Sequence, residues 1–475
     1  MAKNLRTFIQ DIEKYAPGEL VHIQKQVNPK FESTTLLRKL ELEGKQPIAI
    51  FDSPLDLYGK PSSLPLIFNA FSNRKKLAVA IGLFQSDAKM ELSLGLKNLY
   101  STSQKPQIID QKEAPVREEI ISAADIDLYK MPIPTHHEKD GGPYITCGSM
   151  ITKSRKTGNF NAAMIRFQIQ GPQTMAVHTE RHHHSSIITR EYIDEGLEAP
   201  FAIVIGHHPA FYLGSQWEGG YGTDEYSIIS AALGESVRLI PSETLGNDFL
   251  VPADAEIVIE GFVLPDKTVP EGPLGEHTRY YKSIKGGKYI PHEDPLCRLT
   301  AITMRKDAYY QSCFVGHSEH FLIGAIPKEA VIYERIKVVA PGVQAVHMTP
   351  AGVGRYICYF SLKQLVGGEA QDAIMAAFTG DQHIKYVFAV DEDIDIFSDS
   401  EVLWALATRT QPNKNIFIIP AARGAGLDPT VDSKRPITSK MGIDATKPFG
   451  EPFSETCEVP LDMLKNLRIE DYGVK

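Results

Sequence analysis

The feature of this sequence that most limits its fold is a run of short, β-prone segments in the middle of the chain. Between residues 125 and 314, segments rich in Val, Ile, Thr and Phe alternate with Gly, Pro or Asn turns. Such segments are typical of strands joined by tight turns, and a long series of them forms a barrel or a sandwich. The expected strands are 150–152, 161–170, 174–178, 201–206, 256–263, 297–303 and 309–314, with one helical insert at 185–195.

On either side of this middle part, the pattern changes to alternating helices and strands. Alternation of this kind is typical of α/β domains. Before it, we expect helices at 5–15 and 33–43 and strands at 19–24, 47–51 and 64–71, followed by a linker at 105–117. After it, we expect helices at 327–339, 369–378 and 400–408, strands at 343–348, 356–361, 386–390 and 415–420, and an irregular tail at 424–452 that wraps another domain or subunit.

These patterns predict a multidomain α+β or α/β protein. The 475 residues exceed what one hydrophobic core holds. We expect a first α/β region at 1–120, a central β-barrel domain at 121–320 and a C-terminal α/β domain with an extended tail at 321–475.

The overall charge and the cysteines narrow the class of protein. The net charge of −9 and the absence of a basic run argue against a nucleic-acid partner. The five cysteines are scattered, without a CxxC pair, which argues against a disulfide framework or a thiolate zinc site. No apolar stretch is long enough for a membrane span, and no signal peptide is recognisable. We therefore expect a cytoplasmic, soluble protein.

Two glutamates, Glu271 and Glu276, flank a Gly-Pro-Leu-Gly segment. An offset of five residues points side chains in different directions on a regular helix or strand, so only a bend directs both carboxylates at one point. Pro restricts its own φ and Gly accepts a positive φ, which favours such a bend. The alternative is a surface hairpin with two solvated carboxylates.

Three further segments carry polar groups that a barrel does not need for stability. Asn161 and Arg166 share one predicted strand, and their offset places them on opposite faces unless a bulge intervenes. Four histidines lie within 178–184, which indicates either a metal site or surface polarity. Glu225 lies at a predicted helix start, where the helix dipole also favours a carboxylate. Asn and Glu oxygens with a His nitrogen would suit Mn²⁺ or Mg²⁺.

Taken together, these segments resemble the UbiD-type (de)carboxylases, which use prenylated FMN, and the resemblance covers essentially the whole chain. It implies a split β-barrel that binds the flavin and a metal at 121–320, and an oligomerisation role for 321–475 in a homodimer or homohexamer. The matching segments are Asn161 to Arg166, the histidine run, the segment around Glu225, residues 247–261, Pro270-Glu-Gly-Pro-Leu-Gly-Glu276, residues 391–409 and residues 440–446.

The resemblance also implies roles for particular residues. Asn161, Glu225 and one histidine would hold a divalent ion, typically Mn²⁺, which clamps the flavin phosphate together with K⁺. Among the four histidines, His182 best fits the family's spacing from the asparagine, ahead of His178, His183 and His184. The remaining expected cofactor contacts are Arg166, Ser215 near K⁺ and Lys385 near the phosphate.

The implied activity is the reversible, non-oxidative decarboxylation of an aromatic, heteroaromatic or α,β-unsaturated carboxylic acid, through a covalent adduct with prenylated FMN supplied by a flavin prenyltransferase. Loss of CO₂ leaves electrons behind, and no side chain here can accept them, so a cofactor is needed in any case. Arg166, Glu271 and Glu276 correspond to the family's Glu–Arg–Glu network, with Glu276 as the proton donor. The alternatives are a metal-dependent hydrolase built on the histidines and a non-catalytic subunit of a larger carboxylase complex.

Overall fold

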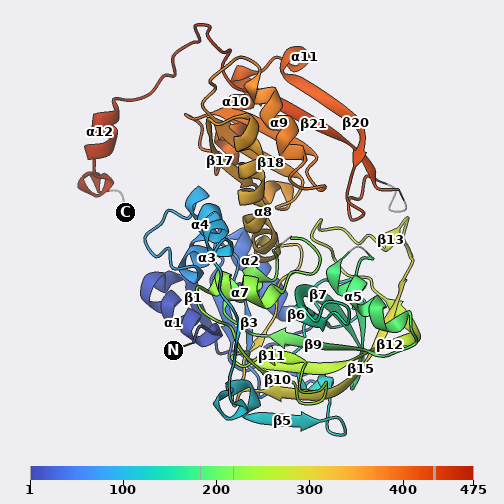
Figure 1. Ribbon diagram of the computed structural model, residues 1–475. Helices are drawn as coiled ribbons and strands as arrows, with labels where there is room; N and C mark the ends of the chain where they lie inside the picture. The colour runs from blue at the N-terminus through green and yellow to red at the C-terminus, as the bar shows by residue number, and fades with distance from the viewer. Residues whose placement is uncertain (1, 182, 218, 432–434, 474–475) are drawn as a thin grey trace.

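Six long strands in the middle of the chain close into an antiparallel barrel in the computed structural model (Figure 1). The model describes residues 2–181, 183–217, 219–431 and 435–473. The barrel order is β12-β9-β6-β7-β8-β15, with β12 and β15 paired to complete the ring. Its strands are β6 (Tyr144–Lys153), β7 (Phe160–Gly171), β8 (Thr174–His178), β9 (Ala199–Ile205), β12 (Ile257–Glu271) and β15 (His292–Met304). The expected central barrel is therefore confirmed.

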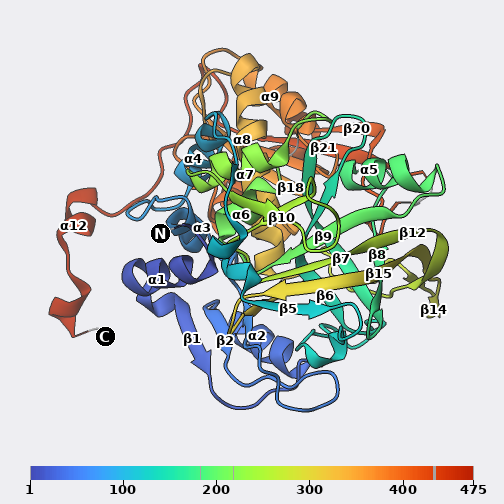
Figure 2. The same ribbon diagram turned by 60° about the horizontal axis from the view of Figure 1, so that its bottom comes forward.

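Closure of the barrel follows from its apolar interior. Phe167, Phe201, Ile203 and Ile259 are fully buried members of one core cluster inside the ring. A ring of paired strands leaves few free strand edges, so backbone groups are satisfied without help from other elements. One further strand, β5 (Glu119–Ser122), pairs with β15 on the outside of the barrel (Figure 2).

The N-terminal part is a small α/β layer, and it corrects one expectation. Helix α1 (Leu5–Tyr15) has the predicted bounds, and β1 (Leu20–Ile23), β2 (Ile48–Phe51) and β3 (Leu66–Phe68) follow as predicted. The segment 309–314, expected in the barrel, instead provides β16 (Tyr310–Gln311), which pairs in parallel with β3. A short apolar run indicates that a strand forms. It does not indicate which sheet the strand joins, because that depends on the direction of the chain after the preceding turn.

The C-terminal part is a five-stranded sheet with the order β17-β18-β19-β21-β20. Its predicted elements are present: β17 (Val343–Met348), β18 (Ile357–Leu362), α9 (Glu369–Phe378), β19 (Tyr386–Asp391), α10 (Asp399–Arg409) and β20 (Ile416–Arg423). The expectation of an irregular tail at 424–452 is wrong, because this segment contains β21 (Ile437–Ala445) between β19 and β20. Lys440 interrupts the apolar pattern by which this strand could have been predicted. In the structure its side chain is buried and donates to the carbonyl of Gln382.

The helix expected to begin at residue 327 begins nine residues earlier. Helix α8 (Ser318–Val339) contains Pro327 in its interior. Proline removes one backbone hydrogen bond from a helix. The fully buried residues Ala325 and Ile326 just before it show that tertiary packing maintains the helix through this position. In Figure 1, α8 connects the barrel side of the molecule to the C-terminal sheet.

The remaining elements are short or peripheral. The expected linker at 105–117 is not a free linker, because its strand β4 (Gln107–Ile108) pairs with β10 (Arg238–Pro241). No described helix is long and apolar enough to cross a membrane. The other elements are α2 (Glu32–Leu42), α3 (Arg74–Ala80), α4 (Met90–Tyr100), α5 (His184–Ile193), α6 (Pro209–Gly214), α7 (Glu225–Leu233), β11 (Leu250–Pro252), β13 (Ile284–Lys285), β14 (Lys288–Tyr289), α11 (Pro412–Asn415) and α12 (Leu461–Asn466).

A buried carboxylate, Glu329 on α8, ties the N-terminal helices to the C-terminal sheet. It accepts hydrogen bonds from Arg74 on α3 at 3.0 Å and from the backbone of Met348 at 3.1 Å, and it also bonds Ser93 and His347. Burial by itself would raise the pKa of Glu329, but the charge of Arg74 and the bond to His347 lower it to about 2. This cluster holds the C-terminal sheet beside the rest of the molecule.

We predict that Glu329→Gln lowers the free energy of unfolding at pH 7 by about 3 kcal/mol, because it leaves the Arg74 guanidinium without its anion. In the wild type, the contribution of Glu329 is present above the ordinary glutamate pKa of 4.5 and is lost as the pH falls toward 2. The variant lacks this acid-dependent loss. Urea unfolding measured at several pH values reports both effects.

The matched control is Glu392→Gln, which removes a half-exposed carboxylate whose nearest cation, Lys363, lies 4.0 Å away. We expect it to change stability by less than about 0.5 kcal/mol. Equal stability of the Glu329 variant and this control would show that the junction does not depend on the buried carboxylate.

Candidate active site

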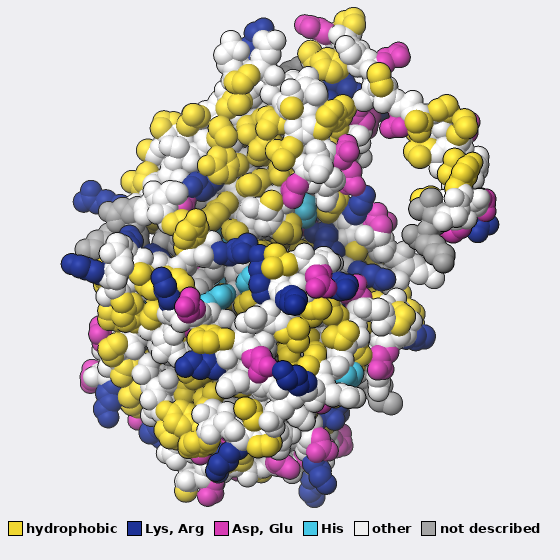
Figure 3. Space-filling model, turned by 180° about the vertical axis from the view of Figure 1, so that it is seen from behind, with side chains coloured by type: hydrophobic (Ala, Val, Ile, Leu, Met, Phe, Trp, Pro, Cys, Tyr) yellow, Lys and Arg dark blue, Asp and Glu magenta, His cyan; other side chains and the backbone are white. Residues whose placement is uncertain are grey.

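Two adjoining cavities lie where the barrel meets the C-terminal sheet. The first, which we name the Arg166 cavity, has a volume of about 240 Å³, and the second, the Glu225 cavity, about 340 Å³. Met164, Ile165, His183 and Gln216 line both, so the two form one continuous hollow. On the face drawn in Figure 3, Lys, Arg and His side chains gather at the level where the C-terminal sheet meets the rest of the molecule.

Arg166 binds both predicted glutamates. Its Nε and Nη2 atoms each donate to one oxygen of Glu271 at 3.0 Å, and its Nη1 donates to Glu276 Oε1 at 2.5 Å. Glu271 is fully buried and Glu276 is 8% exposed. The predicted triad is therefore assembled, and the surface-hairpin alternative for the two glutamates is wrong.

Charge stabilises this arrangement. Burial by itself would lower the pKa of Arg166, but the nearby charges of Glu276 and Glu271 outweigh it and raise that pKa. The guanidinium therefore stays charged. Two carboxylates share this one cation in a largely buried place.

The bend between the two glutamates is held by backbone hydrogen bonds from outside the loop. Gly272 has a φ of +97°, a conformation that glycine adopts without strain, and the Gly272–Pro273 peptide bond is cis. The N–H of Gly272 donates to Gln168 at 2.9 Å, and the N–H of Gly275 donates to Asp140 at 2.9 Å. The loop that carries Glu276 is thus attached to β7 and to the segment before β6.

Close packing fixes the same loop from its other side. A Cβ atom on Gly275 would lie 2.6 Å from the ring of His137, which is itself stacked on Phe314. A side chain at this position would displace Glu276 or the ring. Glycine is therefore required here by contact, whereas at Gly272 it is required by backbone conformation.

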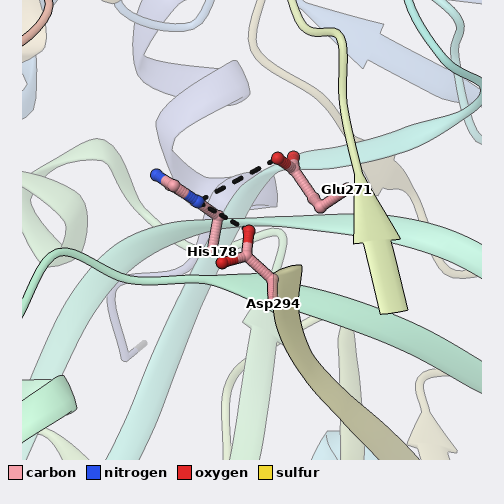
Figure 4. A group of neighbouring side chains, drawn as sticks. All are labelled: His178, Glu271 and Asp294. Carbon is pink, nitrogen blue, oxygen red and sulfur yellow. Dashed lines mark hydrogen bonds and ion pairs between the residues drawn. The ribbon is translucent and has the colours of Figure 1, made fainter. Parts of the chain in front are cut away.

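His178 lies beside the triad, paired with an acidic residue. Its Nδ1 atom is 2.7 Å from Asp294 Oδ2 and 4.0 Å from Glu271 Oε2 (Figure 4). The three side chains are close enough to surround an ion. However, both oxygens of Glu271 already accept from Arg166, and a metal ion would stand next to that cation. The group is better described as a His–Asp pair next to the triad.

Asn161 and Glu225 meet in the Glu225 cavity. Asn161 Nδ2 donates to Glu225 Oε1 at 2.6 Å, and His184 Nδ1 lies 3.6 Å from the same oxygen. Asn161 Oδ1 is buried without a hydrogen-bond partner among the described residues. A buried carbonyl oxygen without a partner costs free energy, and a cation would satisfy it. The donor set of two oxygens and an imidazole nitrogen fits a divalent ion such as Mn²⁺.

Asn161 and Arg166 contact different ends of the hollow. β7 pairs regularly with β6 from Asn161 to Ile165, and the register then shifts opposite Arg166, between Ile145 and Gly148 of β6. Asn161 contacts Glu225, and Arg166 contacts the two glutamates of the bent loop.

Of the other residues expected in the site, some line the cavities and some do not. Ser215 lines the Glu225 cavity, and its hydroxyl donates to the carbonyl of Tyr212. Lys385 is not among the residues lining either cavity; it pairs with Asp428 at 2.8 Å and with Thr430. His182 lies outside the described residues. Of the other three histidines of the run, His178 is engaged by Asp294, which separates it from the Asn161–Glu225 pair.

Several residues of the hollow were not predicted from the sequence. Gln168 and Asp140 hold the loop that carries Glu276, and Asp294 pairs with His178; the two partners of each bond lie more than a hundred residues apart in the chain. No local pattern marks them, because their partners are brought close by barrel closure. His277, His320 and Arg355 also line the Arg166 cavity. Burial lowers the pKa of His320 to about 3 and that of His277 well below its ordinary value.

Comparison with known proteins agrees with this geometry. Models of the 3-octaprenyl-4-hydroxybenzoate carboxy-lyase (UbiD) N-terminal, Rift-related and C-terminal domains match residues 13–99, 107–318 and 321–445. The anhydromevalonate phosphate decarboxylase of Methanosarcina mazei is 31% identical over 430 residues, 90% of this chain and 93% of that protein.

Solved structures give the same result. The UbiD-class enzyme HmfF from Pelotomaculum thermopropionicum, in complex with FMN, is 34% identical, with a TM-score of 0.89 over 99% of this chain and 100% of that one. An evolved dimeric form of HmfF in complex with prFMN is 32% identical, with a TM-score of 0.87 over 99% of this chain and 100% of that one. This chain belongs to the UbiD family of carboxy-lyases.

Proposed function

We propose that this carboxy-lyase catalyses the reversible, non-oxidative decarboxylation of an α,β-unsaturated, aromatic or heteroaromatic carboxylic acid with prenylated FMN. The observation that carries the proposal is the Arg166 fork, which holds two glutamates at one end of a hollow whose other end has an unpartnered amide oxygen. A scaffold without activity has no use for that arrangement.

In this proposal, a divalent ion binds Asn161 Oδ1, Glu225 and a histidine of the 182–184 run, with K⁺ near Ser215. The position of His184, 3.6 Å from Glu225, supports a histidine as the third ligand. The flavin phosphate would complete the coordination of the ion, as Mn²⁺ and Mg²⁺ sites commonly do with phosphate oxygens. When bound, prenylated FMN supplies the electron sink that the side chains lack.

Glu276 is the proposed proton donor. Arg166 occupies both oxygens of Glu271 and Oε1 of Glu276, which leaves Glu276 Oε2 as the oxygen that carries a proton. The proton replaces the departing CO₂ on the substrate carbon. Arg166 pairs with Glu271 and keeps the Glu276 carboxyl group directed into the cavity.

The substrate class follows from the chemistry and the cavity wall. Loss of CO₂ through an electron sink requires a double bond or aromatic ring next to the carboxylate. Leu274, Val315 and Ile323 give the Arg166 cavity apolar surface that suits such a planar group. The similar archaeal protein is named for a phosphorylated acid, which places non-aromatic acids within the proposed range.

We further propose that the chain works as a homo-oligomer that receives its cofactor from a flavin prenyltransferase. After residue 447 the chain leaves the body, and residues 448–473 are exposed. Leu461, Leu464 and Leu467 in and after α12 are each about half exposed or more. An apolar tail of this kind is suited to a second copy of the chain. The similar HmfF form is described as dimeric.

Replacing Glu276 by Gln is expected to reduce turnover by at least about 10²-fold, because the amide keeps the shape of the side chain but cannot give up a proton in this role. Flavin absorbance should remain at the wild-type level. The measurement is CO₂ release from a panel of unsaturated and aromatic acids, with protein produced alongside a flavin prenyltransferase. Glu293→Gln, an exposed position on β15, is the control; a Glu276 variant as active as that control contradicts the donor role.

Replacing Glu225 by Ala is expected to remove the divalent ion and the flavin together, because the carboxylate is the charged member of the proposed ligand set. Metal analysis and the flavin spectrum of the purified protein report the two losses. The control is Asp224→Asn, which keeps an oxygen to cap α7 at Tyr226. Full loading of the Glu225 variant with metal and flavin would exclude the ligand role.

A further inference from the structure

The proposed reaction consumes one proton for each molecule of acid, since R–COO⁻ and H⁺ give R–H and CO₂. Glu276 is therefore left ionised after each turnover and needs a new proton. Glu276 is 8% exposed, and Arg166 occupies its Oε1 atom. A titratable group that lines the same cavity is within reach to supply this proton.

His178 is placed to supply that proton. It lines the Arg166 cavity together with Glu276. It also pairs with Arg166 across β7 and β8, so the two side chains leave neighbouring strands at the same level. Its Nδ1 atom is engaged by Asp294 at 2.7 Å, and its second ring nitrogen points away from both carboxylates (Figure 4). Nε2 is therefore the nitrogen available to the cavity.

The charged and titratable groups that face His178 come from β7, β12 and β15. Asp294 Oδ2 at 2.7 Å and Glu271 Oε2 at 4.0 Å are acidic, and the ring of His292 lies 5.0 Å away. The nearest cation, Arg166, is already paired with two carboxylates. His277 and His320 line the same cavity, but burial lowers the pKa of both rings, which favours their neutral form.

From this geometry we infer that His178, supported by Asp294, returns the proton to Glu276 between turnovers. The inference rests on the proposed function. In the step, the Nε2–H bond of the imidazolium breaks and an O–H bond forms on Glu276 Oε2, directly or through one water. The ring becomes neutral and keeps its Nδ1–H bonded to Asp294. A solvent acid then protonates Nε2 again, so charge and protons balance over the cycle.

In this inference, Asp294 positions His178 and His178 supplies the proton, whereas Glu276 remains the group that protonates the substrate. Asp294 fixes the tautomer and the orientation of the ring, as carboxylates commonly do for histidines that transfer protons. His178 was one of four candidate metal ligands in the sequence. Its bond to Asp294 on β15 gives it this different task.

The test uses the cofactor-loaded protein and the variant His178→Gln, whose amide can still donate to Asp294. We expect kcat to fall about 10- to 100-fold while KM, flavin content and metal content stay unchanged. We also expect kcat of the variant to rise with imidazole concentration, while the wild-type rate does not respond. A structural role for His178 would not produce a rate that depends on an added proton donor.

The control variant is His292→Gln, which removes an imidazole 5.0 Å from His178 that does not line the cavity. It should retain wild-type turnover. A second variant, Asp294→Asn, keeps the shape of the partner but not its charge, and should show a smaller fall in kcat than His178→Gln. If His178→Gln turns over like the His292 control in dilute buffer, or loses activity together with flavin and without a response to imidazole, the inference is overturned.

A readout independent of turnover separates this inference from the proposed function. Acylation of cofactor-free protein by diethylpyrocarbonate, mapped by mass spectrometry, should label His178, whose Nε2 faces the cavity, and spare the fully buried His207 and His208. An unlabelled His178 contradicts the geometry of the inference. Labelled His178 in a wild-type protein that releases no CO₂ from any acid would instead show that the proposed function has failed.

Discussion

A single guanidinium bound to two carboxylates is the interaction on which this site depends. Arg166 fixes Glu271 through two parallel bonds and Glu276 through a third. Such a fork defines direction as well as distance, which a lysine ammonium could not do. Because the group is largely buried, its charges are not screened by water, and one proton on the glutamates has a large effect on the local charge.

The rest of the structure serves to bring the three residues of this group together. β7 supplies Arg166, the end of β12 supplies Glu271, and the loop after β12 supplies Glu276. Gln168 and Asp140 hold that loop by its backbone N–H groups, while His137 packs against Gly275. The barrel therefore acts as a frame, and contacts on both sides fix the conformation of the loop that carries Glu276.

The sequence predicted most of the secondary structure and the main residues of the site, but not which distant segments contact one another. The barrel strands, the helix at Leu5–Tyr15 and the residues Asn161, Arg166, Glu225, Glu271 and Glu276 were identified from patterns and from the family resemblance. In the structure, Asn161, Arg166, Glu225 and Glu276 line two adjoining cavities, and Glu271 binds Arg166 behind the cavity wall. The strand β21, the true start of α8 and the sheet that receives β16 were missed. In each case a long-range contact overrode the local pattern.

Taken by itself, the sequence determined the residue types that the chemistry needs and the local bend that joins two of them, because proline and glycine restrict or free the backbone wherever they occur. Tertiary structure decided which groups those residues meet. Asp294 binds His178 although the two residues lie more than a hundred positions apart in the chain, and no rule of sequence spacing predicts that contact. Barrel closure creates it, since strands distant in the chain become neighbours only when the ring is complete.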